Sequence, residues 1–126
     1  YRFDWRAPGL GAAHAVEVPF VFNRLEHAPW NRRGAAGDIP AGARRLAEIM
    51  HRSWIAFART GSPETESLPG WPAYRPGEEK VMVFDETCAV EHDPHGEERG
   101  VWESAAQRLG LAHRPKLIIE GQREDS

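Results

Sequence analysis

The chain has 126 residues, of which 40% are hydrophobic and 28% are charged. This balance predicts a soluble globular domain and excludes disordered and fibrous chains. The net charge of -3 gives no basic surface of the kind that binds nucleic acid, and no apolar run approaches the roughly 18 residues of a membrane span. The single cysteine, Cys88, excludes a disulfide within these residues.

Large aromatic and polar side chains alternate at the start of the chain, from Tyr1 to Trp5. This alternation predicts a β-strand over residues 1–6, which Pro8 and Gly9 end. Because the chain begins inside a strand pattern and without methionine, we expect a piece of a longer polypeptide. Without the parallel neighbours of a larger sheet, the backbone donors and acceptors of this strand must find another partner.

A histidine follows in a loop of small residues: His14 lies among glycine and alanine. Loops after strands often carry catalytic side chains, so His14 is a candidate general base, although a lone histidine also serves as a packing or surface residue. Glu17 is either a solvated or capping carboxylate or an acidic partner of His14. Because Pro19 argues against a central strand, we expect residues 16–22 to form a buried irregular or short helical segment.

Residues 23–37 have the composition of a loop, with Pro29 followed by Gly34 and Gly37. Trp30 either anchors this loop or covers apolar surface beside a cleft. His27 has no partner at metal-ligand spacing and is expected at the surface.

A long amphipathic helix is predicted from Asp38 to Thr60. Asp38 is a good N-cap and Pro40 is tolerated in the first turn, while Gly61 and Pro63 end the helix. Its apolar side chains fall on one stripe, which predicts a structural helix whose His51 and Ser53 lie outside any active site. The stripe comprises Leu46, Ile49, Met50, Ser53, Trp54, Phe57 and Ala58, and the opposite face Arg44, Arg45, Glu48, Arg52 and Arg59.

A polar connection over residues 64–76 follows, in which Trp71 and Tyr74 are expected to fix the loop to the body through their large apolar areas. Residues 80–84 then alternate as in a strand. Residues 88–90 predict a second short strand that pairs with the first as a hairpin. We expect this hairpin to be an antiparallel edge outside a central parallel sheet.

The last part of the chain contains two histidines, His92 and His95, which flank Asp93. They can ligate a metal, but no further ligand nearby completes a zinc site, so we expect a surface loop. Residues 97–109 predict a final helix that Gly110 ends, with an apolar stripe of Val101, Trp102, Ala105 and Leu109. Residues 116–120 predict a short strand or an apolar tail, and residues 121–126 a disordered end.

Four ordered sequence blocks resemble the C-terminal part of the type B carboxylesterases, the family of bacterial para-nitrobenzyl esterases and cholinesterases. They are residues 11–22 (G-A-A-H-A-V-E-V-P-F-V-F), 53–63 (S-W-I-A-F-A-R-T-G-S-P), 70–74 (G-W-P-A-Y) and 81–85 (V-M-V-F-D). The resemblance extends from Tyr1 to about Trp102. It implies an α/β fold, specifically the C-terminal segment of an α/β-hydrolase domain spanning residues 1–126. This segment would contain a terminal sheet strand, a long helix, a small antiparallel edge element and a terminal helix.

The resemblance also implies a role for His14, which matches the histidine of the family's Ser-His-Glu/Asp triad. The family's G-x-S-x-G nucleophile motif, oxyanion loop and acidic triad member belong earlier in chain order and are absent from these residues. We therefore expect a segment that acts on small carboxylic esters only together with the missing N-terminal part, needs no cofactor or metal, and is inactive alone. The alternative is a non-catalytic module that covers its apolar surface by self-association. The ester specificity and cellular location stay open.

Overall fold

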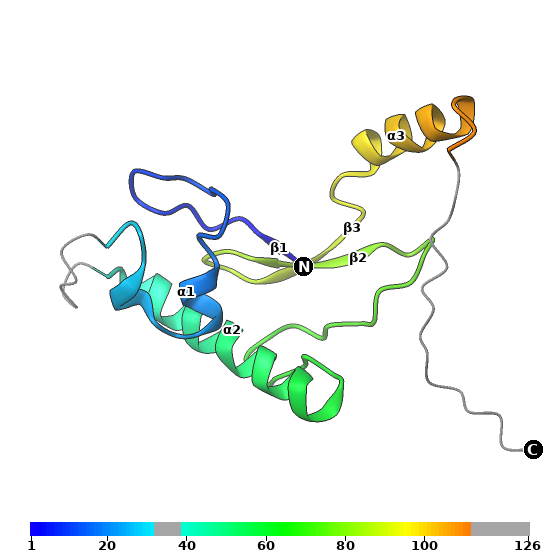
Figure 1. Cartoon of the computed structure of the whole chain (residues 1–126). Helices are drawn as coiled ribbons and strands as arrows, with labels where there is room; N and C mark the ends of the chain where they lie inside the picture. Colours follow the sequence, from blue (N-terminus) through cyan, green and yellow to red (C-terminus); the bar gives the residue numbers. More distant parts are fainter. Residues whose placement is uncertain (32–38, 112–126) are drawn as a thin grey trace, which may run out of the picture. The chain divides into compact units, whose positions relative to one another are not determined.

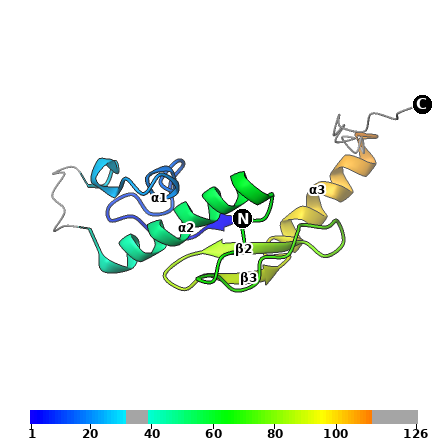
Figure 2. The ribbon, with the colours of Figure 1, turned by 90° about the horizontal axis from the view of Figure 1, so that it is seen from below.

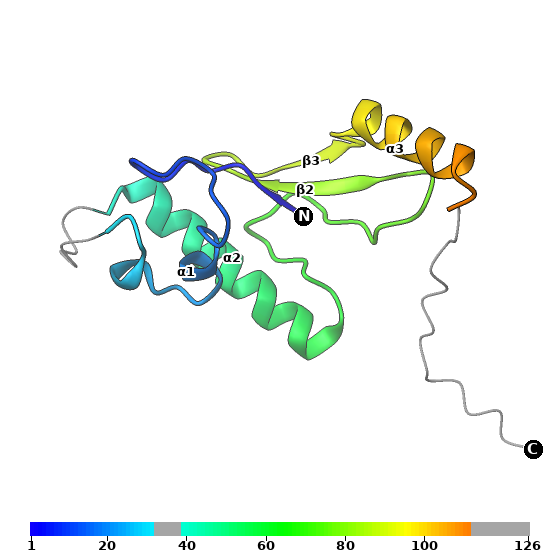
Figure 3. The same cartoon turned by 45° about the horizontal axis from the view of Figure 1, so that its top comes forward.

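The computed structural model describes residues 1–31 and 39–111, which fall into two compact units, residues 1–94 and residues from 95 onward. The first unit contains a three-stranded sheet in the order β1-β2-β3, formed by β1 (Arg2–Phe3), β2 (Lys80–Phe84) and β3 (Ala89–His92). Its helices are α1 (Val18–Val21), the 3-10 turn η1 (Leu25–His27) and α2 (Ala41–Thr60). In Figure 3, α1 and α2 lie on the same side of the sheet.

The sheet corrects two expectations about the strands. β2 and β3 form the predicted antiparallel hairpin, with Met82 opposite Val90 (Figure 2). However, β2 also pairs in parallel with β1, with Phe3 opposite Phe84, so the hairpin is not a separate edge and the first strand has a parallel partner within the chain. A partner about 80 residues away leaves no local sequence signal.

The first strand is also shorter than the predicted residues 1–6. Only Arg2 and Phe3 pair as a strand, and the Asp4 N–H adds one more bond to the Phe84 carbonyl at 2.9 Å. Beyond this point Trp5 is buried in the core although the chain has left the sheet. Aromatic burial, and not strand pairing, accounts for the alternation in the sequence here.

α2 follows the predicted amphipathic pattern. Its buried face combines with α1 and the sheet in one core, while the predicted charged face is exposed. Pro40 is the N-cap, Asp38 lies outside the described residues, and Gly61 ends the helix with a φ of 77°, a left-handed conformation that glycine adopts readily. The buried side chains of α2 are Ala43, Leu46, Ala47, Met50 and Ser53.

The end of the predicted apolar stripe is an exception. Phe57 is 59% exposed although it lies at the correct helical spacing, and Ala58 is exposed as well. The last turn of α2 reaches a pocket, described below, in which the described residues do not cover the Phe57 ring. Tyr74, expected to fix its loop to the body, is likewise exposed, whereas Trp71 packs on Phe84 with ring centroids 5.5 Å apart.

The second unit contains α3 (Gly96–Arg108), close to the predicted helix over residues 97–109, and Gly110 follows it with a positive φ. None of its side chains is buried, and Val101, Trp102 and Leu109 of the predicted apolar stripe are exposed. Arg99 and Glu103, four residues apart, form an ion pair with 2.6 Å between Nη1 and Oε1, which stabilises the helix. The predictions for residues 116–120 and 121–126 concern residues outside the described part of the chain.

No helix among the described residues is long and apolar enough to cross a membrane.

Candidate active site

The loop between β1 and α1 carries His14 and runs out from the sheet and back (blue in Figure 1). Ala7 and Gly11 form an isolated antiparallel bridge at its base, in which the Ala7 N–H donates to the Gly11 carbonyl at 3.0 Å. The Gly11 N–H returns a bond of 2.9 Å to the Ala7 carbonyl. The outgoing part of the loop is thus closed by its own backbone.

His14 itself lies in a tight turn. The Val16 N–H donates to the Ala13 carbonyl at 3.2 Å, which places His14 and Ala15 at the two central positions. Ala15 has a φ of 64°, and a positive φ at the third turn residue is the feature that defines a type II turn. Alanine pays a steric cost there that glycine would not, so the surrounding packing must hold the turn in place.

That packing comes from both sides of the turn. Trp5 and Ala7 precede it and Val16 and Phe20 follow it, and all four are buried. Three rings, those of Phe3, Trp5 and Trp30, surround Phe20, and we call these four residues the closed cluster. The Phe20 ring lies 5.0 Å from both Phe3 and Trp5 and 6.3 Å from Trp30. Trp30 therefore anchors its loop, one of the two roles predicted for it.

The imidazole of His14 is exposed, although buried residues hold the backbone that carries it. The side chain is exposed and has no hydrogen bond or ion pair with any described residue. No hydrogen bond joins it to Glu17, whose backbone begins α1 and whose carbonyl accepts from the Phe20 N–H at 2.9 Å. Among the described residues, none pairs with the ring of His14 as a nucleophile or as an acid.

The other polar residues singled out in the sequence do not join His14. His51, excluded from the site by its place in the helix, bonds through Nδ1 to the Val21 carbonyl, and the Ser53 hydroxyl donates to the Ile49 carbonyl. His27 is exposed beside Glu26, and His95 faces Glu98 in the second unit. Among the described residues, no group of three or more histidine, cysteine, aspartate or glutamate side chains can hold a metal.

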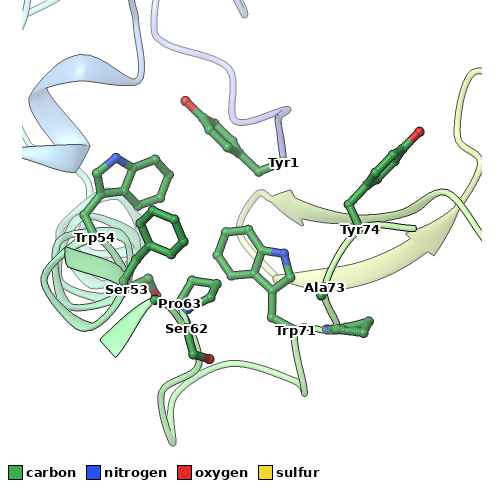
Figure 4. Close-up of a pocket in the computed structure, with 11 residues that line it drawn as sticks. Tyr1, Ser53, Trp54, Ser62, Pro63, Trp71, Ala73 and Tyr74 are labelled. Carbon is green, nitrogen blue, oxygen red and sulfur yellow. The ribbon is translucent and has the colours of Figure 1, made fainter. Parts of the chain in front are cut away.

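A pocket of about 580 Å³ opens on the same unit and was not predicted. Three rings that line it, those of Tyr1, Trp54 and Trp71, pack on the ring of Phe84, and we call these four rings the open cluster. Phe84 is buried, and the ring of Tyr1 lies edge-on to that of Trp54 with the centroids 5.0 Å apart. Figure 4 shows Tyr1, Trp54 and Trp71 around the pocket, whose lining is mainly apolar. In the sequence, the spacing of Trp54 and Phe57 on α2 indicated an apolar surface but not a pocket.

Tyr1 connects the pocket with the loop of His14. Burial of its ring, and then the negative charge of Glu17, raise the pKa of the Tyr1 phenol above its usual value. The carboxylate of Glu17 therefore acts electrostatically on the Tyr1 phenol, although it makes no hydrogen bond to His14.

Comparisons with known proteins agree with this architecture. A family model described as the carboxylesterase family matches residues 1–102. A para-nitrobenzyl esterase of Bacillus subtilis is 37% identical over 102 residues, which cover 79% of this chain and 20% of the esterase. A phenmedipham hydrolase of Pseudarthrobacter oxydans is 36% identical over 99 residues, 74% of this chain and 20% of the hydrolase.

Solved structures give the same result for the fold. A thermophilic PNB esterase superposes with a TM-score of 0.68 at 34% identity, covering 79% of this chain and 20% of that one. A carboxylesterase of Geobacillus stearothermophilus gives 0.66 at 43% identity, with 81% and 21% covered. The chain thus has the fold of a segment of an α/β-hydrolase domain, as predicted, and spans about a fifth of the length of these relatives.

Proposed function

This chain belongs to the carboxylesterase family, and on that premise we propose that it supplies the catalytic histidine of a carboxylic ester hydrolase that uses a serine nucleophile. The observation that carries the proposal is the presentation of His14. Its backbone is fixed by buried residues on both sides, while its imidazole is exposed and bonded to no described residue. Such a ring is available to a nucleophile contributed by other residues.

In the proposed mechanism, His14 acts twice as base and twice as acid. It takes the proton of a serine hydroxyl as the oxygen attacks the ester carbonyl, and it gives that proton to the departing alcohol, which leaves an acyl-enzyme. It then takes a proton from water as the water attacks the acyl group, and returns it to the serine oxygen as the acid leaves. Imidazole suits both roles because its ordinary pKa of about 6.5 lies near neutrality.

The serine, the acidic partner of His14 and the oxyanion donors lie outside this chain in the proposal, because the G-x-S-x-G motif is absent from its sequence. We expect the chain alone to hydrolyse an activated ester such as para-nitrophenyl acetate no faster than the same concentration of free imidazole. A saturable rate that disappears in His14→Ala would contradict this expectation.

A chimera tests the role of His14 directly. Residues 1–102 of this chain replace the matching fifth of the Bacillus subtilis para-nitrobenzyl esterase, and a fluorophosphonate probe then reports the activated serine. We expect the chimera to be labelled, His14→Ala to suppress labelling, and the control His27→Ala to leave it unchanged. Equal labelling of the His14→Ala chimera and its parent would refute the proposal.

A second candidate function, self-association, is favoured by one observation: the open cluster and its pocket leave apolar rings uncovered. Phe57 and Tyr74 line this pocket and are exposed, and exposed apolar patches mark interaction sites. Sedimentation of the chain over a range of concentrations tests this. A concentration-dependent dimer that Phe57→Ser abolishes supports the module, and a monomer at all concentrations rejects it.

A further inference from the structure

His51 has a role that its place on the helix α2 does not suggest. Its Nδ1 lies 2.9 Å from the carbonyl oxygen of Val21, a residue 30 positions earlier in the chain. Because a carbonyl oxygen only accepts, Nδ1 must carry the proton. Val21 is the last residue of α1, the helix that follows the His14 turn.

The bond completes the end of α1. A helix end leaves its last four carbonyls without helical partners. In α1 the Val18, Pro19 and Phe20 carbonyls accept from backbone N–H groups of residues 22, 24 and 23, at 3.2, 2.7 and 3.1 Å. The Val21 carbonyl receives its bond from the side chain of His51. A four-residue helix is too short to be stable alone, so α1 depends on such tertiary contacts for its position.

Hydrogen bonds in series connect this tether to the turn of His14. The Val21 N–H donates to the Glu17 carbonyl at 3.1 Å. Glu17 is bonded to Val18, whose N–H donates to the Ala15 carbonyl at 3.3 Å. The Val16 N–H then closes the turn on the Ala13 carbonyl. His14 is a central residue of that turn. Hydrogen bonds and the peptide bonds between them therefore connect α2 with the segment that carries the imidazole.

We propose that His51 is a positioning residue that holds the turn of His14 through α1. The proposal rests on the proposed function only in giving this positioning a catalytic purpose. In the proposed reaction, His51 touches no reacting atom. Its contribution is to fix a strained turn, whose Ala15 has a positive φ, on the long helix α2, whose inner face is part of the core, because catalytic groups must be held within a fraction of an ångström.

Two substitutions separate the hydrogen bond from the bulk of the ring. His51→Leu fills similar space without a donor, whereas His51→Asn places a side-chain N–H near the position of Nδ1. Amide hydrogen exchange of Val16 and Val21 in the chain itself is the readout. The Asp4 N–H, bonded to Phe84 in the sheet, is the internal reference, and His27→Leu is the control for loss of an exposed imidazole.

We expect His51→Leu to speed exchange at Val16 and Val21 about tenfold, the size of one lost hydrogen bond to a partly buried acceptor, with the Asp4 amide unchanged. His51→Asn should restore most of the protection. In the wild type, the nitrogen NMR signals of neutral His51 should show the proton on Nδ1. Unchanged exchange in His51→Leu, or equal exchange in the leucine and asparagine variants, would overturn the proposal.

The catalytic purpose is tested in the esterase chimera. We expect kcat to fall about tenfold in His51→Leu with KM unchanged, and to recover in His51→Asn, whereas an unaltered kcat would reject positioning as the role of His51. The exchange measurement reports the tether whether or not His14 is catalytic, and His14→Ala in the same chimera reports catalysis whether or not the tether exists. Failure of one proposal is therefore distinguishable from failure of the other.

Discussion

The closed and open clusters are both built from four aromatic rings in residues 1–94, yet they differ in what surrounds them. In the closed cluster, Trp5 and Phe20 are buried, and every member comes from the first 30 residues. In the open cluster, Phe84 is buried, but Tyr1 is 55% exposed and a pocket of about 580 Å³ opens beside the rings. The residues of this chain suffice to hold the backbone of His14, whereas the described residues leave the pocket uncovered.

This difference predicts a large loss of stability when a ring of the closed cluster is truncated and almost none when an exposed ring beside the open cluster is. Phe20→Ala removes a fully buried side chain from the closed cluster and should lower the free energy of unfolding by about 3–5 kcal/mol. Phe57→Ala removes a largely exposed ring beside the open cluster and should change it by less than about 0.5 kcal/mol. Urea unfolding of the three proteins measures both values. Equal losses would show that the ring of Phe57 is packed as tightly as that of Phe20.

The strain in the His14 turn gives a smaller effect. Ala15→Val places a β-branched residue at a φ of 64° and should cost about 1–2 kcal/mol of stability. Ala15→Gly removes the steric cost but loosens the unfolded chain, so its stability should stay within about 1 kcal/mol of the wild type. The same urea titration separates them. A valine variant as stable as the glycine variant would mean that the turn does not hold Ala15 in this conformation.

The smallest predicted effect couples the two regions. Burial and then Glu17 raise the pKa of Tyr1, so Glu17→Gln should lower that pKa without returning it to the usual value. A tyrosine whose folded pKa is raised stabilises the fold below pH about 10, and this stability is lost as pH rises through the folded pKa. Carbon NMR titration of the Tyr1 ring provides the measurement. If the titration of Glu17→Gln coincides with that of the wild type, the carboxylate does not act on the open cluster.

Periodic features of the fold were predictable from the sequence, because they depend on near neighbours. The spacing of Leu46, Met50 and Ser53 identified the buried face of α2, and Gly61 identified its end. The alternation in residues 80–84 likewise identified β2. Long-range pairing left no such signal: the parallel contact of Phe3 with Phe84 depends on where the chain returns, and the strand over residues 1–6 was therefore predicted too long.

The candidate site was predictable in part for the same reason. Glycine and alanine around His14 indicated an accessible imidazole, which is confirmed by its exposure, while its catalytic role stays a prediction. The bond from His51 to Val21 was not predictable, because the pattern of α2 separates a buried face from an exposed one but does not show which element a partly buried residue contacts. The pocket was missed because Phe57 and Tyr74 were expected to be buried.

The most direct test of His14 as general base is chemical rescue in the esterase chimera. We predict that His14→Ala lowers kcat for ester hydrolysis by about 10²- to 10⁴-fold, the usual contribution of general acid–base catalysis. Added imidazole should restore part of the lost rate in this variant and leave the unmodified chimera unaffected. A His14→Ala chimera that retains its full kcat would contradict the central claim that this chain carries the catalytic base.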